Sequence, residues 1–129
     1  MANTFLRKTS KSVGIPANDA GWWQVGASTA GASQSGAYAV GSSTTTTVIG
    51  FSITNVTTSS VDVDVSLSTT MDNITNDIAL VSSAPIPSGS TLVLFGGDQK
   101  LNMVTGDLIK VKSSANNSVD VCMSVLEIT

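Results

Sequence analysis

The sequence predicts an all-β fold: a single antiparallel β-sandwich, of jelly-roll or immunoglobulin-like type, with an N-terminal arm and one long Gly/Ala/Ser-rich loop. The chain has 129 residues, the length of one domain, and 41% are hydrophobic while only 12% are charged, so it can fold around a single core. Ser and Thr exceed a quarter of the residues, Val is abundant, and Glu127 is the only glutamate. This composition disfavours helices, and short alternating runs between frequent turn residues are typical of a sandwich.

The chain divides into three parts. Residues 1–13 form an N-terminal arm or a first strand, with the strand expected at 4–13. Residues 14–36 are rich in Gly, Ala and Ser, have no regular period and carry Trp22 and Trp23, which predicts a long loop. Residues 37–129 form the β-sandwich domain.

Two runs in the first half of this domain predict strands with opposite polar and apolar faces. In residues 59–67 the core face is expected to carry Val61, Val63, Val65 and Leu67, and the solvent face Asp62, Asp64 and Ser66. In residues 44–54 the alternation places Ile49, Phe51 and Ile53 on one face, opposite Val48, Ser52 and Thr54.

Further strands are expected at 91–95, 107–113 and 118–128, and weaker ones at 37–41, 78–82 and 99–104. The 107–113 strand should point Ile109 and Val111 inward and Lys110 and Lys112 outward. In the last strand the inward residues are Val119, Val121, Met123 and Val125, and the face then shifts at Leu126 and Ile128, which predicts a bulge or a change of neighbour. Turns are expected at 55–60, 85–90, 96–98, 105–107 and 115–117.

Composition argues against most catalytic chemistry. Without histidine the chain has no Ser-His-Asp or Cys-His catalysis and no imidazole metal ligand, and the single Cys122 is interpreted as a small buried or half-buried residue. Asp62 and Asp64 are too few ligands for Ca²⁺ and are expected to be solvated. We therefore expect no enzymatic activity, no cofactor and no metal.

The charge pattern bears on partners. A sequence pI near 4.4 with six scattered Lys and Arg residues disfavours nucleic acid. The longest apolar runs are shorter than a membrane span, and the charged N-terminus is not followed by the apolar segment of a signal peptide, so we expect neither membrane insertion nor secretion.

Two segments are candidates for binding another protein. In the N-terminal segment these are Phe5, Leu6 and Arg7, which either pair within their own domain or add a strand to a neighbouring sheet edge. In the long loop, Trp22 and Trp23 either anchor a partner or cover the open end of the core, and a sugar-binding platform is a third interpretation.

Several turns and strand ends carry a resemblance. The runs TTTTVIG at 44–50, APIPSGS at 84–90, GGDQKL at 96–101, TGDLIKV at 105–111, SVDV at 118–121 and SVLEIT at 124–129 resemble small virion structural proteins of tailed bacteriophages, especially phages of aquatic cyanobacteria. The resemblance covers roughly residues 40–129 and does not extend to the segment with Trp22 and Trp23.

The resemblance implies a non-enzymatic virion protein, made in the cytoplasm of the host bacterium, that contacts other virion proteins and forms homo-oligomers. The first interpretation of the chain is a capsid decoration or cement protein that bridges neighbouring subunits of the major capsid protein. The alternatives are a neck, tail or fibre-attachment subunit, and a carbohydrate-binding module for host attachment.

Overall fold

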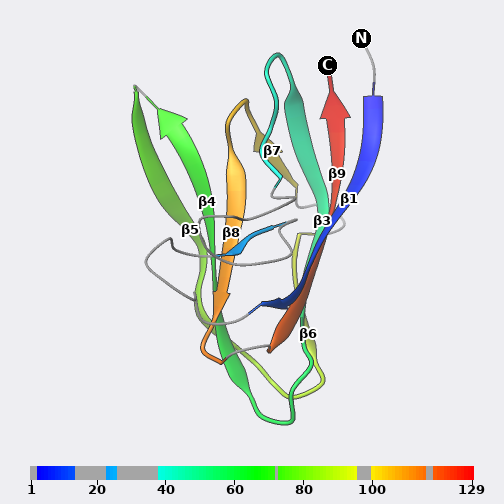
Figure 1. Ribbon diagram of the computed structural model, residues 1–129, viewed down its shortest axis with the longest axis vertical. Coiled ribbons are helices and arrows are strands. Elements are labelled where there is room, and N and C mark those ends of the chain that lie inside the picture. Colours follow the sequence, from blue (N-terminus) through cyan, green and yellow to red (C-terminus); the bar gives the residue numbers. More distant parts are fainter. Residues whose placement is uncertain (1–2, 14–22, 26–37, 72, 96–99, 116–117) are drawn as a thin grey trace.

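A computed structural model describes residues 3–13, 23–25, 38–71, 73–95, 100–115 and 118–129. Within these ranges the chain is all-β, without a helix, and two antiparallel sheets face each other, consistent with a β-sandwich (Figure 1). The strands are β1 (Asn3–Val13), β2 (Trp23–Gln24), β3 (Thr45–Asn55), β4 (Val61–Met71), β5 (Ile74–Ile86), β6 (Thr91–Phe95), β7 (Leu101–Met103), β8 (Leu108–Ser113) and β9 (Val119–Ile128).

The strand order interleaves the two halves of the chain. The five-stranded sheet has the order β1-β9-β3-β6, with β7 also paired to β3, and the four-stranded sheet has the order β2-β8-β4-β5. The chain passes from one sheet to the other at every connection except β4–β5 and β6–β7. As a result β1 and β9, from opposite ends of the sequence, lie side by side (Figure 1).

The core lies between the inner faces of the sheets, and three strands have the faces that alternation predicts. Buried residues include Val61, Val63 and Val65 of β4, Ile109 and Val111 of β8, and Val119, Val121, Met123 and Val125 of β9. Ser66, expected in solvent, is also buried, next to a register shift between β4 and β5. Phe51 contacts the edge of the Phe95 ring, with 6.3 Å between ring centroids.

A bulge in β3 overturns part of the predicted facing of that strand. Val48 is fully buried whereas Ile49 is only half-buried, the reverse of the expectation, although Phe51 and Ile53 point inward as expected. The register against β9 shifts between Val48 and Gly50, so the inner face continues from Val48 to Phe51, three residues on. The bulge therefore lies in β3, and β9 pairs with β1 without a shift from Ile128 to Val121.

Other segments also differ from the expectation. Residues 38–40 are not a strand, although Tyr38 N donates to Val25 O at 3.0 Å and Val40 N to Asp107 O at 3.0 Å. The expected strand 78–82 is part of the 13-residue β5, and β2 falls inside the expected loop 14–36. The expected turn at 96–98 lies outside the described residues.

The turn between β3 and β4 is held by one buried amide. The Asn55 Nδ2 donates to Ser59 O at 2.8 Å and to Ile86 O at 2.9 Å, while its Oδ1 accepts from the backbone N and the hydroxyl of Thr57. All hydrogen-bonding positions of this amide are thereby used. Asn55 therefore ties the β3–β4 turn to the end of β5.

Candidate partner-binding surface

The N-terminal segment forms an edge strand of the five-stranded sheet. β1 pairs antiparallel with β9 of the same chain, from Asn3 opposite Ile128 to Ser10 opposite Val121, and the register then shifts before Val13. Of the two arrangements left open by the sequence, the structure therefore has the one in which the segment pairs within its own domain. Among the described strands, none pairs with the other side of β1.

Alternation along β1 divides the three predicted binding residues between two faces. Leu6 lies opposite Val125 and packs against the core. Phe5 and Arg7 are exposed on the outer face, opposite Leu126 and Ser124, and the Phe5 side chain is 72% exposed.

The two predicted tryptophans are not joined to this surface by the described structure. Trp22 and the side chain of Trp23 lie outside the described residues. The backbone of Trp23 is in β2 and pairs with Val111 of β8, in the other sheet. The predicted binding residues thus belong to two sheets, and their role in binding stays a prediction.

Two shallow depressions follow β9 on the outer face of the five-stranded sheet. The first, of about 330 Å³, is lined by Phe5, Leu6, Arg7, Ile49, Ser124 and Val125. It exists because Ser124 is small and Gly50, which lies opposite it, has no side chain. The bulge in β3 turns Ile49 outward, so that β1 and β3 each place an apolar residue beside the depression.

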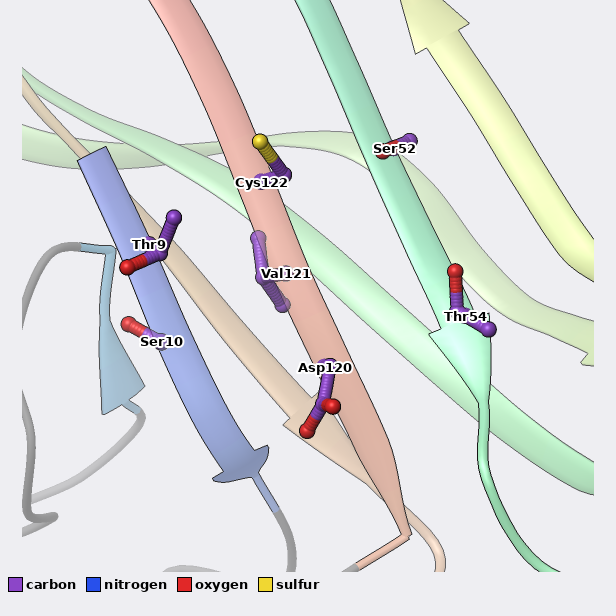
Figure 2. A pocket seen from close by; sticks show the side chains of 7 residues that line it. All are labelled: Thr9, Ser10, Ser52, Thr54, Asp120, Val121 and Cys122. Carbon is purple, nitrogen blue, oxygen red and sulfur yellow. The ribbon is translucent and has the colours of Figure 1, made fainter. Parts of the chain in front are cut away.

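The second depression, of about 280 Å³, lies further along the same strand (Figure 2). β1 contributes Thr9, β9 contributes Asp120 and Cys122, and β3 contributes Ser52 and Thr54, with Ser10 and Val121 completing the lining. Cys122 is exposed, so its interpretation as a buried or half-buried residue is wrong. The cause is the alternation itself, since Val121 and Met123 on either side point inward.

Sequence reasoning missed a polar cluster on the inner side of the same strands. The Tyr38 hydroxyl donates to Glu127 Oε2 at 2.6 Å and shares a hydrogen bond of 2.8 Å with Thr46 Oγ1. Lys8, which faces inward opposite Met123, places its Nζ 5.5 Å from the centroid of the Tyr38 ring. The cluster joins the segment 38–40 to β1, β3 and β9.

Burial, the largest cause, and the hydrogen bond to the Glu127 carboxylate together raise the pKa of Tyr38 to about 12. The phenol therefore stays protonated and donating throughout the physiological range. No local pattern in the sequence links Tyr38, the only tyrosine, to Glu127, the only glutamate. Their proximity depends on the chain folding residue 127 beside residue 38, which local patterns do not contain.

Several carboxylates are engaged in structural contacts. Asp64 Oδ1 accepts from Ser83 N at 2.8 Å, Asp107 Oδ2 accepts from Val104 N at 3.0 Å, and Asp77 Oδ2 lies 2.8 Å from Lys110 Nζ. Across the described ranges, no three acidic, cysteine or histidine side chains gather where they could hold a metal ion.

No protein-family model, curated protein or solved structure matches this chain. The described residues include no helix that is long and apolar enough to cross a membrane. The surface along β1 and β9 is the strongest candidate for a functional site.

Proposed function

We propose that this chain is a non-enzymatic structural protein of a tailed-phage virion, and within the virion a capsid decoration protein that bridges neighbouring subunits of the shell. The strand order is the observation that carries the proposal, and the exposed side chains of Phe5 and Arg7 support a contact with protein. The proposal places the chain in a phage virion because its turn and strand-end runs resemble those of phage virion proteins.

The strand order supports the jelly-roll of the two sandwich types expected. When the three-residue β7 is set aside, eight strands remain, four in each sheet, and the order interleaves the first strands of the chain with the last. Two interleaved Greek keys of this kind define the jelly-roll, an architecture used by viral capsid domains and by lectins. Because capsid domains and lectins both use this architecture, the choice between the two functions rests on the side chains exposed on the surface.

The surface favours association with protein. The outer face of β1 presents an apolar ring and a guanidinium on a strand edge, which are side chains suited to protein contacts. Three carboxylates, Asp64, Asp77 and Asp107, are engaged in hydrogen bonds or an ion pair within the domain. The same surface would serve a neck or tail subunit, with a ring of copies in place of a shell lattice.

The hydroxyl-lined depression favours a second candidate, a carbohydrate-binding module. Thr9, Ser52 and Thr54 supply hydroxyl groups that can exchange hydrogen bonds with a sugar. This candidate is second because, among the described residues, no aromatic ring lines that depression. Specific binding on a glycan array, abolished by Thr54→Val, would place it first.

Quantitative mass spectrometry of purified particles of the encoding phage tests the proposal. A decoration protein is expected in copy numbers comparable to the major shell protein. A few copies per particle would indicate a neck or tail ring instead, and absence from purified particles would overturn a virion role.

A further inference from the structure

The free edge of β1 is the most regular unpaired strand edge among the described strands. β1 keeps a continuous register with β9 over eight residues, Asn3 to Ser10. In comparison β6 has five residues and a register shift against β3, and β5 shifts register twice against β4. An edge of this kind leaves alternate N–H and C=O groups available to another strand.

Two features limit where a strand can add. Lys8 points inward from the edge strand, and inward charges oppose indefinite edge-to-edge pairing. The register shift after Ser10 ends the regular edge. The segment available for pairing with another strand is therefore Asn3 to Thr9. It is long enough to pair with one short strand but not with a longer one.

We propose that the occupant of this edge is β1 of a second copy of the chain, paired antiparallel about a two-fold axis that passes beside Leu6. The axis runs perpendicular to the sheet, so the pairing joins two five-stranded sheets into one. In this arrangement the outward side chains are complementary, Phe5 of one copy to Arg7 of the other.

Symmetry restricts the possible registers. A two-fold axis perpendicular to the sheet keeps outer faces together, so each residue can only oppose a residue on the same face of β1. With Leu6 on the axis, Phe5 of each copy lies beside Arg7 of the other, and all seven residues from Asn3 to Thr9 are paired. Each guanidinium can then lie over the face of a phenyl ring, where a cation is attracted.

The neighbouring registers are worse. With Arg7 on the axis, the two guanidinium groups lie directly opposite each other on one face, where like charges destabilise the pair. With Phe5 on the axis, the paired stretch shrinks to Asn3–Arg7 and Arg7 faces only Asn3. The register centred on Leu6 alone combines full overlap with favourable outer pairs.

The inference goes beyond the proposed function, because it concerns the isolated chain in solution and its failure would leave the virion role to its own test. Sedimentation equilibrium of the purified protein is expected to show a monomer–dimer equilibrium. Phe5→Ala and Arg7→Ala should each weaken the dimer about tenfold, because each removes two symmetric contacts at once. Val93→Ala is the matched control: Val93 is 64% exposed on β6, at the other edge of the same sheet, and its loss should leave dimerisation unchanged.

Disulfide mapping in a Cys122→Ser background tests the register. Directly opposed Cα atoms lie about 4.5–5.5 Å apart, within disulfide range, so Leu6→Cys should form a covalent dimer with itself. Thr4→Cys should not cross-link alone but should do so when mixed with Lys8→Cys. Thr4 is exposed and Lys8 is only half-buried, so this pair keeps the test valid if Leu6→Cys loses stability.

Three results would overturn the inference. The first is a protein that stays monomeric at every concentration. The second is cross-linking of Thr4→Cys with itself, which would place the axis elsewhere. The third is growth beyond a dimer or equal weakening by Val93→Ala, which would indicate head-to-tail contacts through another edge.

Discussion

The buried phenol of Tyr38 gives the sharpest prediction, through the substitution Tyr38→Phe. The change removes one hydroxyl, and with it the bonds to Glu127 Oε2 and Thr46 Oγ1, while the ring can stay in place. Leaving buried partners without a donor costs about 1–3 kcal/mol, so the free energy of unfolding should fall by that amount at neutral pH.

The difference in unfolding free energy between the wild type and Tyr38→Phe depends on pH because the pKa of Tyr38 is raised. A shift from 10.0 to about 12 stabilises the folded protein by about 2–3 kcal/mol while the phenol is protonated. Because the folded-state pKa lies above the unfolded one, this contribution is complete below pH 10 and is lost as the pH rises toward 12. The stability advantage of the wild type over Tyr38→Phe should therefore shrink between pH 10 and 12.

Two measurements check this. Urea denaturation of both proteins across that pH range gives the stability difference, and the subtraction removes the contributions of groups that the substitution does not affect. Because Tyr38 is the only tyrosine, its ionisation can also be followed directly by ultraviolet absorbance. In Glu127→Gln the phenol should titrate lower than in the wild type but still above 10, because burial is the larger cause. A wild-type phenol that titrates near pH 10 while the protein is folded would refute the reasoning.

Four further changes test the fold and the edge. Val63→Asp should destabilise by several kcal/mol and Asp62→Ala by less than about 0.5, because Val63 is fully buried and Asp62 exposed; equal melting temperatures would contradict these faces. Cys122 should react with a thiol reagent in the folded protein, and protection until unfolding would contradict its exposure. Deletion of residues 2–12 should lower the melting temperature because it uncovers β9, whereas an unchanged value would mean that β1 serves assembly alone. Lys8→Val should increase light scattering by removing the inward charge from the edge, and wild-type behaviour would count against that protective role.

Sequence patterns located the strands whose burial alternates without interruption. In β8 and β9, and in β4 as far as Val65, one face packs on the core and the other is more exposed, so the period of two appears directly in the residues. The same rule failed at Val48 and Ile49, because a bulge is decided by the pairing of β3 with β9 and not by either strand alone. It also missed the length of β5, in which Ile74 and Ile78 are exposed and no buried face marks the first residues.

The candidate site was harder to predict from the sequence than the strands were, because the position of β1 at the edge of a sheet depends on the order of all the strands in that sheet. Phe5 and Arg7 could be singled out as residues, but whether β1 lay between two strands or beside one depended on where β9 folded. Once β9 takes the inner position, the alternation of β1 points Lys8 toward Tyr38 and leaves Phe5 and Arg7 outside. β1 therefore has two roles, because its side chains alternate between the two faces of the sheet. The inward residues pack against the core, and the outward residues are available to a partner. A substitution on one face can therefore change folding while its neighbour on the other face changes assembly.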